Sequence, residues 1–202
     1  MGACGCKRKS SVCSAWSGFK LNPHLEASLF VDVPGLISKQ RAQALAEGLL
    51  RHQSVEPARF DTQVPTAPAY YNYLPFIRLL VESIPLIETI CEEKVLPTYA
   101  YARVYGHGDV LVRHRDREAC ELSVTLNLAS DELWPIWMNS PRGESKAISM
   151  EPGDAVMYLG CEADHWREAF VGQRCSQVFL HYVFSHGSKA HFYFDKKKVN
   201  TA

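Results

Sequence analysis

A mainly β domain with helices at its N-terminal end is the fold class that the sequence predicts. Apolar residues at helical spacing are confined to residues 38–95, and short β-like stretches follow one another over residues 98–184. Helices first and many short strands after them are typical of a sandwich or jelly roll with helical support on one side. The 202 residues suffice for one substantial core, so we expect a single domain over residues 21–202, preceded by a tail.

The helical support is expected within residues 38–95. Ser38 is a good N-cap residue and precedes apolar residues at helical spacing. Pro85 lacks a backbone donor and stands in the middle of the next helical stretch, so we expect a kink or a break there. In chain order, we expect a strand over residues 25–33, a helix over 38–52, an extended proline-rich connection over 54–75 and an interrupted helix over 76–95.

The β core is expected within residues 98–185. After Pro97, large and small residues alternate over residues 98–105, and turn residues separate the stretches that follow. The expected strands cover residues 98–105, 109–114, 121–128, 135–138, 147–150, 155–159 and 177–184. Residues 191–202 contain three consecutive lysines and are expected to be a charged tail.

Composition and charge exclude several classes of protein. With 22 basic and 22 acidic side chains the net charge is zero, so no nucleic acid is expected as a partner. No apolar run has transmembrane length and the N-terminus lacks the apolar block of a signal peptide, which predicts a cytoplasmic protein. The seven cysteines are an odd number at irregular spacing, so we expect mostly reduced thiols.

The first 20 residues are small, polar and basic, and we expect them to be a flexible tail. Two sharper hypotheses stay open for them. Gly2, Cys4 and Cys6 resemble a dual-acylated membrane anchor, although the myristoylation pattern has Ser or Thr at position 6. The same two cysteines with Cys13 could instead bind a metal, but no second pair of ligands follows.

A metal site is indicated by His114 and Asp116, which are two residues apart in a β-like stretch. Side chains at this spacing leave the same face of a strand, and two His with one carboxylate form the facial triad of non-haem Fe(II) oxygenases. The His-x-acid pattern is weak alone, since about one is expected by chance and His24-Leu25-Glu26 also fits.

The third ligand is predicted to be His165, which lies 49 residues after Asp116 beyond the strand-like sequence PGDAVMYL. Three protein ligands leave open positions for a chelating cosubstrate and O₂. Nine residues after His165 stands Arg174, whose guanidinium could hold a carboxylate through two parallel hydrogen bonds. A surface arginine is the plainer interpretation of Arg174 taken alone.

These motifs resemble those of the Fe(II)/2-oxoglutarate-dependent oxygenases, particularly the prolyl-4-hydroxylase-like branch, over most of residues 99–184. The sequence YGHG at 105–108 followed by VRHRD at 112–116 is similar to the family's first metal-ligand segment. The sequence MEPGDAV at 150–156 is similar to the strand that precedes the distal histidine. His165 with Arg174 is similar to the family's distal ligand and cosubstrate anchor.

The resemblance implies a double-stranded β-helix (jelly roll, cupin-like) as the core of a single oxygenase domain. His114, Asp116 and His165 would be the catalytic Fe(II) ligands, and Arg174 would pair with the distal carboxylate of 2-oxoglutarate. Tyr105 or Thr125 would hydrogen-bond the cosubstrate, although ordinary strand packing competes for Tyr105. With O₂, such an enzyme hydroxylates an unactivated C–H bond and releases succinate and CO₂.

Substrate identity is less well indicated than the chemistry. The stretches WPIWM at 134–138 and HWRE at 165–168 depart from the collagen-type prolyl hydroxylases and look typical of a poorly described subgroup, so prolyl specificity is not inherited. A peptide, protein or amino-acid-like substrate is expected. The alternatives are a small-molecule 2-oxoglutarate oxygenase and, in another class, a non-catalytic metal-binding jelly-roll module.

Arginines are frequent around the first metal-ligand segment. Arg115, Arg117 and Arg167 are candidate substrate residues, with Arg103 and Arg113 nearby in the sequence. Solvated or structurally paired side chains are the plainer explanation for all five.

Overall fold

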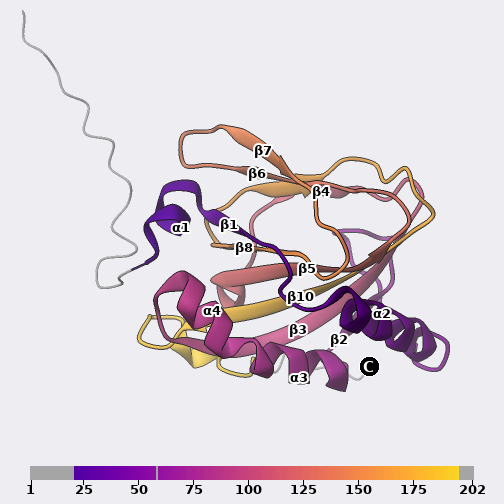
Figure 1. Cartoon of the computed structure of the whole chain (residues 1–202), viewed down its shortest axis with the longest axis horizontal. Coiled ribbons are helices and arrows are strands. Elements are labelled where there is room, and N and C mark those ends of the chain that lie inside the picture. The colour runs from indigo at the N-terminus through magenta and orange to yellow at the C-terminus, as the bar shows by residue number, and fades with distance from the viewer. Residues whose placement is uncertain (1–20, 58, 196–202) are drawn as a thin grey trace, which may run out of the picture.

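Two antiparallel β-sheets face each other in the computed structural model, which describes residues 21–57 and 59–195 (Figure 1). The larger sheet has the strand order β1-β8-β5-β10-β3-β2, and the smaller sheet has the order β4-β9-β6-β7. Every strand pair is antiparallel. The predicted fold class, a jelly roll with N-terminal helices, is confirmed.

The elements follow the predicted order of helices first and strands after them. They are α1 (Pro23–Ser28), β1 (Phe30–Val33), α2 (Lys39–Gln53), β2 (Ala69–Tyr71), α3 (Leu74–Glu82), α4 (Ile84–Cys91), β3 (Val95–Gly106), β4 (Leu111–His114), η2 (Glu118–Cys120), β5 (Leu122–Ser130), β6 (Ile136–Asn139), β7 (Ser145–Ile148), β8 (Ala155–Tyr158), β9 (His165–Arg167), β10 (Arg174–Phe184) and η3 (Ala190–Phe192). Among these described helices, none has the length and apolar character needed to cross a membrane.

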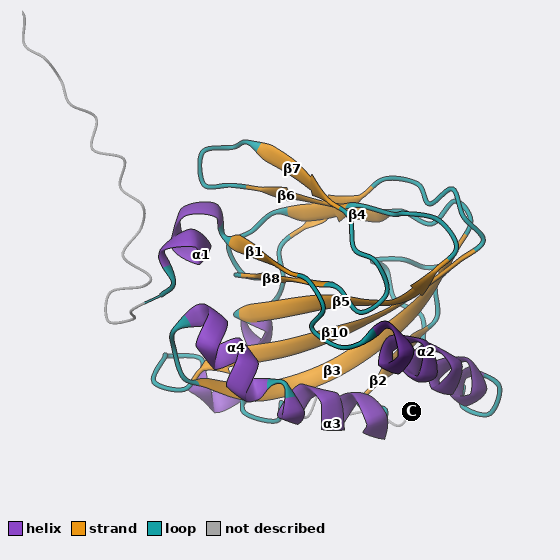
Figure 2. Ribbon diagram, viewed as in Figure 1, coloured by secondary structure: helices purple, strands orange, loops and turns teal. Residues whose placement is uncertain are grey.

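The helices cover one face of the larger sheet, and the smaller sheet covers the other (Figure 2). Alternate residues of β3, β5 and β10 therefore have different surroundings. Those on the helix side are apolar and form the main core, such as Ala102, Leu126 and Leu180. Those between the sheets include many polar and aromatic side chains. This division places polar chemistry in the interior of the jelly roll.

The prediction of a strand over residues 25–33 is wrong in its first half. Pro23 stands in the first turn of α1, where its missing N–H costs nothing. The side chain of Asn22 accepts a hydrogen bond from the N–H of His24 at 2.9 Å and caps the helix. Leu29 then ends α1 in the left-handed conformation, with φ 70°. These capping signals outweigh the β-like composition, and the strand begins only at Phe30.

Other expected boundaries are confirmed. Ser38 caps α2 by accepting a hydrogen bond from the N–H of Arg41 at 3.2 Å. The helical stretch around Pro85 is split into α3 and α4, and each begins with a proline in its first turn. The short strands β2 and β9 were not expected. Residues 1–20 and 196–202, with the acylation and metal hypotheses for Gly2, Cys4, Cys6 and Cys13, lie outside the described residues.

The proline-rich connection between α2 and β2 packs against the interior through Arg103, a fully buried residue of β3. Its guanidinium donates to the carbonyls of Val64 at 3.2 Å and Ala67 at 3.0 Å, and to the carboxylate of Asp61 at 2.7 Å. Arg103 is thus structurally paired, in line with the plainer of the two interpretations. These bonds hold the connection beside the metal-ligand segment.

Candidate active site

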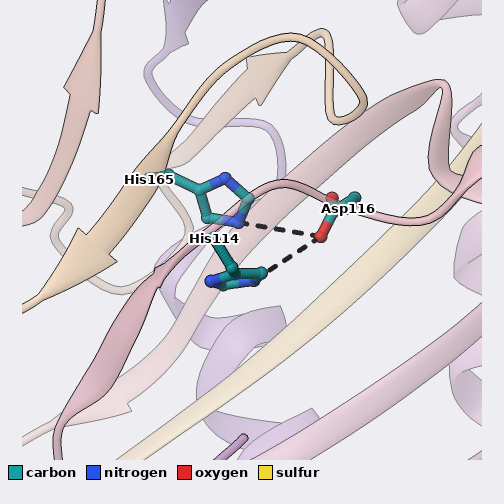
Figure 3. Close-up of side chains that lie close together, drawn as sticks. All are labelled: His114, Asp116 and His165. Carbon is teal, nitrogen blue, oxygen red and sulfur yellow. Dashed lines mark ion pairs between the residues drawn. The ribbon is translucent and has the colours of Figure 1, made fainter.

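His114, Asp116 and His165 converge between the two sheets (Figure 3). Their ligand atoms lie within 4.8 Å of one another. The distance from Asp116 Oδ1 to Nε2 is 3.7 Å for each histidine. The two rings lie 4.2 Å apart between centroids, since β4 and β9 pair with His114 opposite His165. The structure therefore brings together the three residues that the sequence predicted as metal ligands.

Both histidines are oriented by a hydrogen bond to the backbone carbonyl two residues earlier in the chain. Nδ1 of His114 donates to the carbonyl of Val112 at 2.7 Å, and Nδ1 of His165 donates to that of Ala163 at 3.0 Å. With the proton on Nδ1, each Nε2 presents a lone pair to the centre of the group. Metal-binding histidines in proteins are commonly fixed in this way.

Electrostatics at the three residues favours a bound cation. Burial lowers the pKa of His165 to about 4, and burial followed by His165 lowers the pKa of His114. Both rings are therefore neutral near pH 7, and their contacts with the carboxylate are not ion pairs. Burial raises the pKa of Asp116 to about 6, against the opposing effects of Ser123, His114 and Arg117. A divalent cation favours neutral imidazole and an ionised carboxylate, so this donor set fits one.

Asp116 is positioned by residues that the sequence did not indicate. Ser123 donates to its Oδ2 at 2.7 Å, and the same hydroxyl lies 2.9 Å from Nδ1 of the buried His181. The backbone N–H of Asp116 donates to the carbonyl of Gly160 at 2.8 Å. A Cβ at Gly160 would lie only 2.6 Å from Oδ2, so close packing also fixes the carboxylate.

Replacing Ser123 by alanine should weaken metal binding by about tenfold, because groups that orient a ligand carboxylate are typically worth 10- to 100-fold in affinity. Calorimetric titration with Mn(II) measures the change. Ser176→Ala is the matched control, because Ser176 lies on the helix side of β10, away from the triad; it should leave the Mn(II) affinity unchanged. Equal affinities for the Ser123 variant and the wild type would contradict a positioning role.

Gln63 of the proline-rich connection is a further residue that the sequence did not indicate. Its side-chain amide lies 2.5 Å from Nε2 of His114 and donates to the lone pair that faces the site. Its neighbours Asp61 and Val64 are held by Arg103. The connection therefore forms one wall of the site.

A second group of possible ligands, made of Asp116, Cys120 and His181, shares its carboxylate with the first. Burial raises the pKa of the Cys120 thiol, whereas a metal ligand must be a thiolate. The thiol contacts the hydroxyl of Tyr99 at 3.0 Å, and Ser123 bridges Asp116 and His181. These bonds favour the histidine pair as the metal site.

Arg167 is the buried cation nearest in sequence to the triad and is 1% exposed. It stands two residues after His165 on β9, so both side chains enter the space between the sheets. One terminal nitrogen donates to the carbonyl of Trp134, whereas Nε and Nη2 have no hydrogen-bond partner within residues 21–57 and 59–195. Two adjacent donors of one guanidinium are the geometry that grips a carboxylate.

The other predicted cosubstrate residues occupy different places. Arg174 is exposed at the start of β10 and lines a cavity against α2, on the helix side of the larger sheet. The interior neighbour in that strand is Cys175. The alternation of β10 turns this side chain away from the triad, so the structure does not bring Arg174 together with the metal ligands.

Tyr105 and Thr125 do face the interior. Burial raises the pKa of Tyr105 to about 12, against the opposing effects of the Arg103 and Arg167 guanidiniums. The Thr125 hydroxyl lies 3.3 Å from that of Tyr158, whose ring is 4.8 Å from the ring of His165. Both predicted residues are thus within the same polar interior as the triad.

The remaining arginines near the triad have partners. Arg115 and Arg113 each bind Asp164 at 2.8 Å and are more than half exposed. Arg117 lies beside the site, where it pairs with Asp195 and lies over the ring of Tyr99. Of the three candidate substrate residues, Arg115 is a surface ion pair, Arg117 lines a cavity and Arg167 is interior.

Comparisons with solved structures find the same fold in proteins of low sequence identity. A Pseudomonas putida prolyl-4-hydroxylase is 14% identical over 78% of this chain and 94% of its own, with a TM-score of 0.62. The epimerase SnoN, solved with Fe³⁺, alpha-ketoglutarate and nogalamycin RO, is 10% identical over 88% and 89%, with a TM-score of 0.69. HygX from Streptomyces hygroscopicus, solved with nickel, 2-oxoglutarate and hygromycin B, is 10% identical over 81% and 86%, with a TM-score of 0.63.

No protein-family model matches the chain, and no curated protein matches it either. At 10 to 14% identity, the solved structures show a shared jelly-roll fold. The chemistry of this chain rests on its own side chains.

Proposed function

We propose that this protein is an Fe(II)- and 2-oxoglutarate-dependent oxygenase that hydroxylates an unactivated C–H bond and releases succinate and CO₂. One observation carries the proposal. Two histidines and one carboxylate form a group in the interior of the jelly roll. A buried guanidinium with two unpaired donors, that of Arg167, stands on the same short strand as one of these histidines, His165. The first suits a non-haem Fe(II) ion and the second suits the carboxylate of a chelating acid.

His114, Asp116 and His165 would hold the iron. Three protein ligands leave positions open for the 2-oxo acid end of the cosubstrate and for O₂. When bound, iron and 2-oxoglutarate supply the oxidising chemistry, in which decarboxylation of the cosubstrate is coupled to oxidation of the substrate. Ser123 and Gly160 hold the carboxylate ligand, and the two backbone carbonyls hold the imidazoles.

Arg167, in place of Arg174, would bind the distal carboxylate of 2-oxoglutarate. A carboxylate there would satisfy Nε and Nη2 and would neutralise a buried charge. Tyr105 and Thr125 are the nearby hydroxyls that would bind the same acid. Trp134, over whose ring the Arg167 guanidinium lies 4.8 Å from the centroid, packs with Phe170 and excludes water from this end of the interior.

The same guanidinium distinguishes this proposal from a non-catalytic metal-binding module. A module that only holds a metal has no use for a buried carboxylate receptor, and leaving a guanidinium buried without partners costs stability. The three-ligand set is also that of an open site, because a closed structural site adds a fourth protein ligand.

Anaerobic reconstitution with Fe(II) and 2-oxoglutarate tests the proposal. We expect a visible charge-transfer absorption band under anaerobic conditions, and release of succinate on exposure to O₂. The variant His165→Ala should give neither. Wild-type protein that binds Fe(II) but develops no band with 2-oxoglutarate, and forms no succinate above the variant, would rule the oxygenase out.

A further inference from the structure

A cavity of about 300 Å³ is lined by the proline-rich connection, by β2 and β3, and by the residue that follows Asp116. Arg117, which follows Asp116 directly, lines it. Tyr99, another lining residue, lies 4.7 Å from the ring of His181, the histidine that shares Ser123 with Asp116. The full lining is Arg59, Phe60, Asp61, Tyr71, Asn72, Tyr99, Arg117 and Asp195. None of these residues is a proposed metal ligand or a proposed contact of 2-oxoglutarate.

The aromatic wall of the cavity is built on stacked tyrosine rings. Tyr71 lies 5.2 Å from Tyr101 with an angle of 19° between the planes, and 6.1 Å from Tyr99 with an angle of 29°. Tyr71 and Tyr99 line the cavity, and Tyr101 stacks against Tyr71 behind them in the sheet. Phe60 of the connection also lines the cavity and is 60% exposed. A flat or cyclic apolar group fits between such surfaces.

The polar side of the cavity has one unbalanced positive charge. Asp61 is paired with Arg103, and Asp195 is paired with Arg117. The guanidinium of Arg59 has no hydrogen-bond or ion-pair partner among the described residues, although it lines the same cavity. An anionic group is therefore the complement that this surface lacks, and a guanidinium binds a carboxylate through two hydrogen bonds.

We propose that this cavity receives the substrate, and that the substrate is a small ring compound with one carboxylate. The inference rests on the proposed oxygenase function, which supplies the reason for a pocket beside the metal. The volume is at the lower end for small-molecule sites and admits a single ring with its substituent. The ring lies between Tyr71 and Phe60, and the carboxylate binds Arg59. This substrate is a free small molecule, in contrast to a peptide or protein.

Ligand-observed NMR on the full chain, loaded with Mn(II) and 2-oxoglutarate, tests the assignment. The probes are benzoate, cyclohexanecarboxylate and phenylacetate, each with its matching primary amide, and an equimolar set of capped peptides. We expect at least one acid to bind about tenfold more tightly than its amide, as a charge-assisted bidentate contact requires. Arg59→Gln should abolish this preference, and Phe60→Ala should weaken the acid and its amide alike.

Arg174→Gln is the matched control, since this exposed arginine lies on the helix side of the sheet, and it should change nothing. The inference is overturned if amides bind as tightly as acids, if no acid binds, if Arg59→Gln has no effect, or if the peptides bind in an Arg59-dependent way while the ring acids do not.

Binding of the metal and of 2-oxoglutarate is measured on the same samples by electron paramagnetic resonance and calorimetry, so the two claims fail separately. Mn(II) and 2-oxoglutarate bound without any ring acid would overturn only the substrate assignment. If a ring acid binds in an Arg59-dependent way but neither Mn(II) nor 2-oxoglutarate binds, the oxygenase function is overturned, whereas the carboxylate-binding site at Arg59 is supported.

Discussion

The variant His165→Ala is expected to lose more than about 100-fold in Fe(II) and Mn(II) affinity and all detectable succinate formation. The imidazole of His165 would be one of three protein ligands of the metal. Even groups that only orient a ligand contribute about 10- to 100-fold to metal affinity. The remaining pair, His114 and Asp116, cannot close a facial triad. Calorimetric titration with Mn(II) and a coupled succinate assay measure the two losses.

The matched control is His186→Ala, which removes an exposed histidine outside the site. It should bind metal and form succinate as the wild type does. Far-ultraviolet circular dichroism on both variants checks that the fold is kept. If His165→Ala bound Mn(II) as tightly as His186→Ala does, His165 would not be a ligand, and the metal would have to be held elsewhere.

The variant Arg167→Met is expected to lose about 30- to 5,000-fold in 2-oxoglutarate affinity while Mn(II) affinity changes little. Truncating one partner of a buried, hydrogen-bonded charge pair costs about 2 to 5 kcal/mol, and the methionine side chain keeps most of the volume. Without cosubstrate, the unfolding free energy should not fall, because methionine removes a buried charge whose Nε and Nη2 have no protein partners, and this offsets the lost hydrogen bond to the Trp134 carbonyl.

Arg174→Met is the control for the cosubstrate, and it should leave 2-oxoglutarate binding intact because the residue is exposed on the helix side of β10. Calorimetry with 2-oxoglutarate in the presence of Mn(II) compares the two variants. The opposite result, with binding lost in Arg174→Met and kept in Arg167→Met, would restore the assignment made from sequence spacing.

The structure brings together the three residues that the sequence predicted as metal ligands, although the prediction rested partly on a geometric reason that does not hold. The strand β4 ends at His114, so Asp116 does not share a strand face with it. Asp116 is brought into the site by the hydrogen bond of its N–H to Gly160 and by Ser123. The first contact joins segments far apart in the sequence, and no local periodicity reveals either one.

The carboxylate-binding arginine was predicted from spacing alone, and the structure places that residue on the helix side of the larger sheet for a reason that the sequence could have shown. Spacing after His165 pointed to Arg174, but the phase of β10 decides which residue faces inward, and it is Cys175. Arg167 stands two residues after His165, and the rule of alternate faces places it with the ligand. The strand β9 was not expected, and Arg167 was predicted as a candidate substrate residue, with a solvated or structurally paired side chain as the plainer explanation.

Gln63, Ser123 and His181 could be found only from the fold. Gln63 belongs to a proline-rich connection whose path depends on the buried Arg103. Ser123 and His181 are polar residues at inward positions of apolar strands, and that pattern is the one signal they leave in the sequence. A polar residue at an inward position of an otherwise apolar strand is therefore worth testing as part of a site.

A crystal structure of the protein with Mn(II) and 2-oxoglutarate, grown without O₂, tests the account most directly. We expect the metal to be bound by Nε2 of His114, Nε2 of His165 and the Asp116 carboxylate, with the distal carboxylate of 2-oxoglutarate paired to Nε and Nη2 of Arg167. A metal held by Cys120 and His181, or a cosubstrate carboxylate found at Arg174 on the other face of the sheet, would contradict it.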